Sequence, residues 1–352
     1  MRTIIKTLIV LIITINSCGY RNTNHAENST INKECASKYR LNAEQGDMNA
    51  QWSLGNCYHL EENYEQAKIW YLKAAEQGYA PAQCDLGSYY FNGEVIDRNG
   101  EQAVHWYRKA VEQEYAPAQY FLGNCYYYSV GVSKNNEQAI YWYRKAAEQG
   151  HAIAQAVLGS CYANGDGVNK NDEQAVFWYK KSAEQGYAPA QNRLGHSYQT
   201  GIGINKNDEE AVYWYHKAAE QGNVAAQINL GMCYELGIGV SSNMVLALFW
   251  IRKAAEQGDT YAQNSLGLYY VHGEGGLNQD YHNAVYWFRK AAEKGYAESE
   301  YHLGICHANG LGVEQDNEKA KYWYRKAAEK GDKDAQKKLE KLLGVILLEL
   351  TE

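Results

Sequence analysis

The chain has 352 residues, which for an ordinary globular protein would be about two domains. It carries 34 basic and 41 acidic residues, which gives a formal net charge of −7. A mildly acidic chain with alternating signs argues against a nucleic-acid partner. Proline occurs only three times and tyrosine 32 times, a composition that suits packed helices.

The N-terminal residues 1–17 are predicted to be a lipoprotein signal peptide. Arg2 and Lys6 give a basic start, and a short, almost entirely apolar run leads to Ser17 and Cys18. Such a run is typical of a secretory signal rather than of a membrane span. The residues before Cys18 resemble the bacterial lipobox, which implies cleavage there and lipidation of Cys18. An ordinary signal peptide is the alternative.

Residues 18–33 are polar and rich in Asn and Thr. A segment with so little to bury is predicted to be a flexible tether. The sequence therefore predicts an exported chain that a lipid on Cys18 anchors to the bacterial cell envelope. Gly19, rather than an acidic residue, follows that cysteine, and by lipoprotein sorting this favours the outer membrane.

A Trp-Tyr-Arg/Lys motif with a few variants then returns about every 36 residues. A fixed period of this size is typical of a solenoid, in which no single unit can bury its apolar face alone. We therefore predict an all-α solenoid of about eight helix pairs over residues 34–344. The tryptophans of the motif are Trp70, Trp106, Trp142, Trp178, Trp214, Trp250, Trp287 and Trp323.

Residues 152–186 show the plan of one pair. Helix A is predicted over 154–163 and helix B over 172–185, with a glycine-rich loop between them. Asn171 or Asp172 is expected to cap helix B. Leu158 and Trp178 are the expected large wedges, and small residues allow the helices to approach closely. The small residues are Ala154, Gly159, Ala175 and Ala183.

Both ends of the repeat array are atypical. An incomplete helix B, Cys35 to Gln45, precedes the pairs, and a final helix, Asp334 to Leu350 within residues 334–352, is predicted to be a cap. Its apolar stretch 342–348 is too short to cross a bilayer. A dimer contact or a peptide-like tail is the alternative role for that stretch. Glu114 takes the place of a helix-ending glycine, which should cost about 1–2 kcal/mol.

The recurring pattern is Ala-Gln-x-x-Leu-Gly-x-x-Tyr, then Gly-x-Gly-Val, then Ala-x-x-Trp-Tyr-x-Lys-Ala-Ala-Glu-Gln-Gly. It resembles the Sel-one-like repeat (SLR), a subclass of the tetratricopeptide superfamily, over about residues 35–344. The resemblance implies a right-handed α-α superhelix whose helices A line a concave face. It also implies protein–protein interaction as an adaptor or scaffold, without naming a partner.

Five cysteines share one site of helix A, which Ser or Tyr fills in the other repeats, so we expect buried thiols there. They are Cys57, Cys125, Cys161, Cys233 and Cys306. Copies on neighbouring repeats should lie about 8–10 Å apart, too far for a bridge. A disulfide from Cys35 to Cys57 or Cys84 is the alternative. Cysteine-rich relatives carry two cysteines per repeat, and this chain lacks the second.

The sequence offers no catalytic motif. Ser-x-x-Lys, which β-lactam-active proteins commonly use, does not occur. His302 and His307 are five residues apart rather than the four that place two metal ligands on one helix face. The Glu-Gln and Arg-Lys pairs of helix B recur with the repeat and are expected to form a solvated face. We therefore predict a protein that is not an enzyme and has no cofactor or metal site.

Partner binding is expected where the repeats differ, on the concave side of helix A. The predicted residues are Trp52, Asn56, Tyr120, Asn124, Tyr127, Asn192, His196, Met232 and Tyr301. Aromatic residues are common anchors, and asparagines can hold a peptide backbone. Ordinary packing is the alternative for each residue.

The sequence therefore predicts an envelope-anchored scaffold for a protein or peptide partner, with its oligomeric state open. The alternatives are a host-interaction factor of an intracellular bacterium and a β-lactam-binding or β-lactam-hydrolysing envelope protein.

Overall fold

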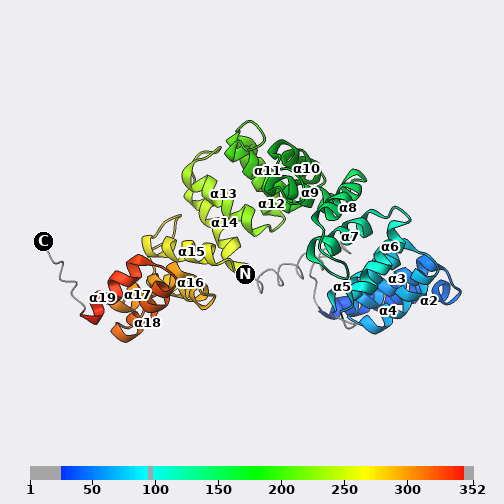
Figure 1. Ribbon diagram of the computed structural model, residues 1–352. Helices are drawn as coiled ribbons and strands as arrows, with labels where there is room; N and C mark the ends of the chain where they lie inside the picture. The colour runs from blue at the N-terminus through cyan, green and yellow to red at the C-terminus, as the bar shows by residue number, and fades with distance from the viewer. Residues whose placement is uncertain (1–24, 94–97, 345–352) are drawn as a thin grey trace. The chain divides into compact units, whose positions relative to one another are not determined.

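The computed structural model describes residues 25–93 and 98–344, and every regular element in these ranges is an α-helix (Figure 1). Consecutive helices pack against each other, which confirms the predicted all-α solenoid. The handedness of the superhelix stays a prediction. The chain divides into unit 1 (Met1–Trp178) and unit 2 (Tyr179–Glu352), and each unit is described by itself.

The odd-numbered helices α3 to α17 are the helices A, and the even-numbered helices α4 to α18 are the helices B. The bounds are α2 (His25–Glu44), α3 (Met48–Leu60), α4 (Tyr64–Glu76), α5 (Ala80–Asn92), α6 (Gly100–Val111), α7 (Ala116–Tyr128), α8 (Asn136–Glu148), α9 (Ala152–Asn164), α10 (Asp172–Glu184), α11 (Ala188–Thr200), α12 (Asp208–Glu220), α13 (Val224–Leu236), α14 (Met244–Glu256), α15 (Thr260–His272), α16 (Tyr281–Glu293), α17 (Ala297–Asn309), α18 (Asn317–Glu329) and α19 (Lys333–Leu343).

Side-chain caps and glycines set the helix ends. Of the two predicted caps of α10, Asn171 is the one used, because its Oδ1 accepts from the backbone N–H of Gln174 at 2.9 Å. Gly186 ends the same helix with a φ of +90°, as predicted. Helix α9 begins two residues earlier than predicted, because His151 caps it by accepting from the backbone N–H of Ala154 at 3.2 Å.

The core follows the predicted pairing of large and small residues, with one addition. Leu158 is fully buried and Trp178 is 9% exposed. The side chain that fills the space beside the Leu-Gly glycine belongs to the residue after the motif tryptophan, which is Ile251 in the sixth repeat, Phe288 in the seventh and a tyrosine such as Tyr143 elsewhere. A Cβ at Gly123 would lie 2.6 Å from Cε1 of Tyr143. The glycine therefore serves close approach of an aromatic ring from helix B.

The ends of the array differ from the predicted boundaries. Helix α2 begins at His25, so it includes residues 25–33 of the predicted tether. Ala36 and Ala43 are buried in its second half, which packs against the first repeat and can nucleate the helix. Extension of a nucleated helix toward the N-terminus then costs little free energy per residue. The prediction of a last helix up to Leu350 is wrong, because α19 ends at Leu343 and Gly344 has a φ of +72°.

The last helix caps the repeat array, and Glu114 forms a turn with a positive φ. Leu339 and Leu342 of α19 pack beside Tyr324 of α18, as a capping helix should. Glu114 has a φ of +58°, which confirms the predicted strained turn. The predicted signal peptide and the apolar residues 345–348 lie outside the described residues. Within the described ranges, no helix is both long and apolar enough to span a membrane.

A disulfide joins α2 to the first repeat, and it corrects the predicted thiol at Cys57. Cys35 and Cys57 are bonded, with their Cα atoms 5.8 Å apart. Cys35 lies on α2, which packs directly against α3, the helix that carries Cys57. Helix α2 is therefore much closer to α3 than the helix A of the next repeat is. The other four cysteines of the shared site, and Cys84, are free and buried.

Candidate partner-binding surface

The glutamine of the Glu-Gln pairs lies on an exposed face, as predicted, but it also bonds to a buried glutamine of helix A. Gln77 at the end of α4 donates to Oε1 of Gln51 at 2.7 Å, and the Nε2 of Gln51 donates to the carbonyl oxygen of Ala43 at 3.1 Å. Gln51 is 5% exposed. The same glutamine–glutamine bond recurs in four other repeats. These amides therefore lock helix B to helix A, because a buried polar group needs a partner.

The last two pairs replace the donating glutamine by lysine. Lys330 Nζ lies 2.5 Å from Oε1 of Glu300, which is 1% exposed. Lys294 instead donates to the carbonyl oxygen of Gly258 at 2.6 Å, and Oε1 of the buried Gln263 has no partner among the described residues. The donor–acceptor pair is thus kept in the eighth repeat, where only Oε2 of Glu300 lacks a partner among the described residues, and it is lost in the seventh.

The Arg-Lys pair also has specific partners instead of a purely solvated role. Arg144 donates to the hydroxyl of Tyr162 on the following helix A at 2.9 Å. Lys253 lies over the ring of Trp250, with its Nζ 5.4 Å from the ring centroid. Equivalent contacts recur along the chain, so the outer layer is tied together by arginine–tyrosine bonds and cation–π contacts.

Two predicted partner-binding residues are buried and serve packing. Tyr120 is 6% exposed, and its ring stacks on His151 with centroids 5.3 Å apart. Asn124 is also 6% exposed, and its Oδ1 accepts from the hydroxyl of Tyr143 at 2.8 Å. Burial lowers the pKa of His151 to about 4, so this imidazole is neutral at physiological pH. Tyr120 and Asn124 are therefore left out of the accessible surface.

The asparagine of the first repeat has the same structural partner but keeps some exposure. Asn56 accepts from the hydroxyl of Tyr71 at 2.6 Å. Where the motif tyrosine is replaced by Ile251 or Phe288, no hydroxyl needs an acceptor, and Met232 or Leu268 occupies the equivalent helix A position. The eighth repeat does not follow this pairing, because Ile305 holds the position there and the motif residue is Tyr324.

In unit 1, the accessible aromatic residues of helix A bridge neighbouring repeats. Trp52 is half-buried and donates from Nε1 to Oδ2 of Asp85 at 2.7 Å. Burial raises the pKa of Asp85 to about 6. Tyr127 is also half-buried, and its hydroxyl lies 3.4 Å from Oδ2 of Asp166. Each bond joins one helix A to the following repeat.

In unit 2, Asn192 and its neighbours form the corresponding surface. Asn229 on α13 donates to Oδ1 of Asn192 on α11 at 2.9 Å. His196 is exposed and Met232 is 36% exposed. Tyr301 is half-buried, with its ring 5.9 Å from that of Tyr324. We use the name helix-A face for the seven predicted residues that keep exposed surface: Trp52, Asn56, Tyr127, Asn192, His196, Met232 and Tyr301.

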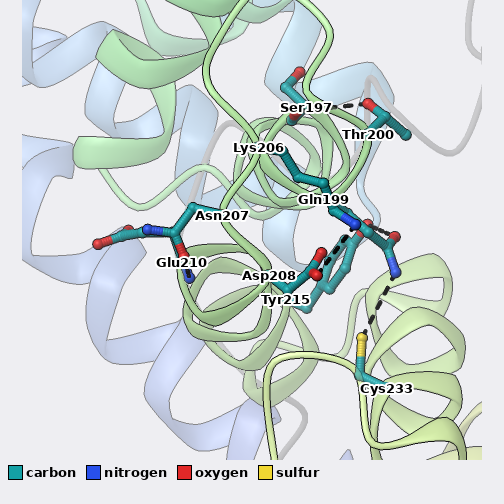
Figure 2. Close-up of polar contacts among 9 residues, drawn as sticks. All are labelled: Ser197, Gln199, Thr200, Lys206, Asn207, Asp208, Glu210, Tyr215 and Cys233. Atoms are coloured by element: carbon teal, nitrogen blue, oxygen red, sulfur yellow. Dashed lines mark hydrogen bonds and ion pairs between the residues drawn. The ribbon is translucent and has the colours of Figure 1, made fainter.

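Figure 2 shows polar contacts among residues of α11, α12 and α13 in unit 2. The hydroxyl of Tyr215 donates to Oε1 of Gln199 at 2.9 Å, and Nε2 of Gln199 lies 3.9 Å from Sγ of Cys233. Asn207 caps α12 by accepting from the backbone N–H of Glu210 at 3.1 Å. Burial raises the pKa of the Cys233 thiol to about 11, so it is protonated and a weak nucleophile at neutral pH.

The other buried thiols are similar, and no metal cluster accompanies them. Burial raises the pKa of Cys125 and Cys161 to about 12 and that of Cys306 to about 11. Among the residues that the structure describes, no group of three or more His, Cys, Asp or Glu side chains is placed to hold a metal ion. Most of these polar groups bond to neighbours within the fold, which defines a helical-repeat protein with structural polar contacts.

The chain belongs to the Sel1 repeat family. Eight consecutive segments match it: residues 49–79, 80–115, 116–151, 152–187, 188–223, 224–259, 260–296 and 297–332. No curated protein matches the chain at a significant level. Sel1 repeat solenoids generally mediate protein–protein interaction and are typically non-enzymatic scaffolds.

Two solved structures are similar over most of the chain. One is a protective antigen present in uropathogenic Escherichia coli strains and displaying an SLR fold. It is 36% identical, with a TM-score of 0.74, and the match covers 88% of this chain and 68% of that one. The other is a Sel1 repeat protein from Oxalobacter formigenes, 30% identical, with a TM-score of 0.65 and coverage of 94% and 99%.

Proposed function

We propose that this protein is a non-catalytic scaffold that binds a protein or peptide partner on its helix-A face. The observation that carries the proposal is the contrast between two sets of residues. The side chains that recur in most repeats are used in packing, such as the paired Gln51 and Gln77. The accessible residues of the helix-A face, such as Trp52, His196 and Met232, differ between repeats. A surface that varies on a constant scaffold is where specific recognition can be encoded.

The two units offer different chemistry to a partner. Unit 1 presents the half-buried Trp52 and Tyr127, each with a polar atom bonded to a carboxylate. Unit 2 presents the exposed His196 and the thioether of Met232. Aromatic and methionine side chains are enriched at interface cores, and both give large contact area. A partner that contacts one unit therefore needs mainly apolar anchors with few fixed charges.

The test is site-specific photo-crosslinking in the full chain, in living cells. A photoreactive residue replaces Tyr127 or Met232, and matched controls replace Tyr141 or Tyr322, which lie on helix B and are each 48% exposed. Adducts of one defined mass at the helix-A positions, without adducts at the controls, support the proposal. Equal adducts at all four positions, or adducts at the controls alone, contradict it.

We further propose that a lipid on Cys18 holds the scaffold at the cell envelope. The motif at residues 15–18 supports this, with a basic start and an apolar run before it. Incorporation of labelled fatty acid into the chain, lost in Cys18→Ser, is the expected result. Equal labelling of the variant would contradict the anchor.

A further inference from the structure

The helices A of unit 1 lack basic residues and carry one carboxylate. Helices α3, α5, α7 and α9 contain no lysine or arginine, and Asp85 on α5 is their only acidic residue. In unit 2, by contrast, the equivalent position on α11 holds Arg193. A charge that is partly removed from water is usually paired. Asp85 therefore lies on a surface that offers it no cation.

Asp85 has one protein partner and one free oxygen. Its Oδ2 accepts from Nε1 of Trp52 at 2.7 Å. Among the residues that the structure describes, none donates to Oδ1, and Oδ1 is not one of the enclosed polar atoms, so solvent or a ligand can reach it. Burial raises the pKa of this carboxyl to about 6, so it is mostly ionised at neutral pH although it has lost part of its hydration. A positively charged hydrogen-bond donor would replace that lost hydration.

The bond between the two repeats does not itself require a charge. In the sixth repeat, Asn229 holds the position of Asp85. It bonds at 2.9 Å to Asn192, which holds the position of Trp52. An amide oxygen accepts an N–H as a carboxylate does. Asp85 also lies in the second turn of α5, beyond the positions at which a carboxylate caps a helix. Packing and capping thus leave the negative charge of Asp85 unexplained.

Three aromatic side chains lie beside Asp85. The ring of Trp52 meets that of Tyr79 edge-on, with centroids 5.7 Å apart. Tyr79 and Tyr115 precede α5 and α7, where they hold equivalent positions. Burial raises the pKa of both phenols and the charge of Asp85 raises each pKa further, so both lie near the carboxylate. All three rings are half-buried. We call Trp52, Tyr79, Asp85 and Tyr115 the Asp85 cluster.

The chemistry of the Asp85 cluster suits an organic cation. The electron-rich face of an aromatic ring attracts a cation, most strongly for tryptophan. Asp47, which caps α3, adds a second negative charge near Tyr79. A metal ion fits less well, because no group of three His, Cys, Asp or Glu side chains is placed to hold one in the described part of the chain. A guanidinium fits best, because its plane stacks on rings while its N–H groups donate to a carboxylate.

We propose that the Asp85 cluster binds an arginine side chain of the partner protein. The guanidinium donates to Oδ1 of Asp85 and lies against the rings of the cluster. Trp52 belongs to the helix-A face, so this site rests on the proposed function and adds the chemistry of its contact in unit 1. Arginine is among the residues that dominate binding energy at interfaces. One arginine at the Asp85 cluster would also fix where the partner lies along unit 1.

Titration of the full chain with an arginine peptide tests the site directly. The probe is acetyl-Gly-Arg-Gly-amide, and the matched probe replaces arginine by citrulline, which has the same shape without the charge. The readout is the NMR signals of the nine tryptophan indole N–H groups, with that of Trp52 identified by its loss in Trp52→Phe. The arginine peptide should shift the Trp52 signal with a dissociation constant of about 1–10 mM at constant ionic strength, and the citrulline peptide should bind at least about tenfold more weakly.

Two variants separate recognition of the charge from packing. Asp85→Asn keeps an oxygen that accepts from Trp52 but removes the charge, so the arginine peptide should bind about tenfold more weakly. Glu137→Gln is the matched control, because it removes one exposed charge from α8 outside the cluster, and its affinity should equal that of the wild type. Unchanged positions of the other indole signals show that both variants fold. If Asp85→Asn does not fold, the comparison of the two peptides on the wild type decides alone.

A Trp52 signal that the arginine peptide does not move at about 50 mM overturns the site. Equal binding of the two peptides, or equal binding of the arginine peptide to Asp85→Asn and to the wild type, also overturns it. Neither result depends on a partner, so crosslinking at Tyr127 and Met232 would still support the scaffold. Conversely, peptide binding with crosslinks at the helix B controls alone would contradict the scaffold's use of the helix-A face and keep the cation site.

Discussion

Replacing the glycine of one Leu-Gly pair should loosen that repeat by a measurable amount. In Gly123→Ala, the new methyl group would lie 2.6 Å from Cε1 and 2.7 Å from Cδ1 of Tyr143, and 3.2 Å from the carbonyl oxygen of Ala139. Overpacking of this kind costs about 1–3 kcal/mol. Removal of a mid-helix glycine returns about 0.5–1 kcal/mol. The expected net loss is about 1–2 kcal/mol.

Hydrogen exchange is the suitable assay, because unfolding of a solenoid can be local to a few repeats. The amides of α7 and α8 should exchange about 5- to 30-fold faster in Gly123→Ala than in the wild type. Gly231→Ala is the matched comparison and should have a smaller effect. There the methyl group would meet Cγ1 and Cδ1 of Ile251 at 2.9 and 3.0 Å, and that side chain can adjust its rotamer. Unchanged or slower exchange in Gly123→Ala would refute the close-packing argument.

Three further predictions follow from individual contacts. The pKa of His151 is about 4 in the folded protein and 6.5 in the unfolded chain, so its contribution to stability is fully present above pH 6.5. About 3 kcal/mol of folding free energy is lost as the pH falls from 6.5 through 4. In His151→Asn this part of the pH dependence of stability should be absent, and its persistence in an acid-unfolding experiment would contradict the assignment. Reduction of the disulfide between Cys35 and Cys57, 22 residues apart, should destabilise the first repeat by about 3 kcal/mol, and unchanged protection of α2 and α3 from hydrogen exchange would argue against it. Lys294→Gln should supply the missing donor to Gln263 and stabilise unit 2 by about 1 kcal/mol in urea denaturation. A loss of stability would show that the bond from Lys294 to the carbonyl oxygen of Gly258 contributes more than the new amide bond.

The sequence alone predicted the parts of the fold that depend on local chemistry. The helix-ending φ of Gly186 and the cap at Asn171 follow from residue type and register. The burial of individual helix A side chains did not follow from the sequence, because it depends on which side chains of the next repeat pack over them. Tyr120 is covered by His151, which lies about one repeat further along the chain. Repeat geometry alone does not predict that a side chain of the following repeat buries the residue.

The glutamine contacts could have been found from the sequence by comparing repeats with one another. A glutamine that recurs in most repeats looks the same in the sequence whether it faces only solvent or also bonds to another recurring glutamine 30 residues earlier. The informative repeat is the eighth, where Glu300 replaces one partner and Lys330 the other, which preserves a donor–acceptor pair. The disulfide had a weaker signal, because only the close packing of α2 on α3 brings Cys35 to Cys57.

We propose that the partner binds the helix-A face and not another surface of the solenoid. The most direct measurement is the position-resolved crosslinking of the full chain in cells, with photoreactive groups at Met232 and Tyr127 on that face and at Tyr322 and Tyr141 on helix B. One partner adduct is expected at the first two positions and none at the others. The same adduct at the helix B positions, with none at Met232 or Tyr127, would contradict it.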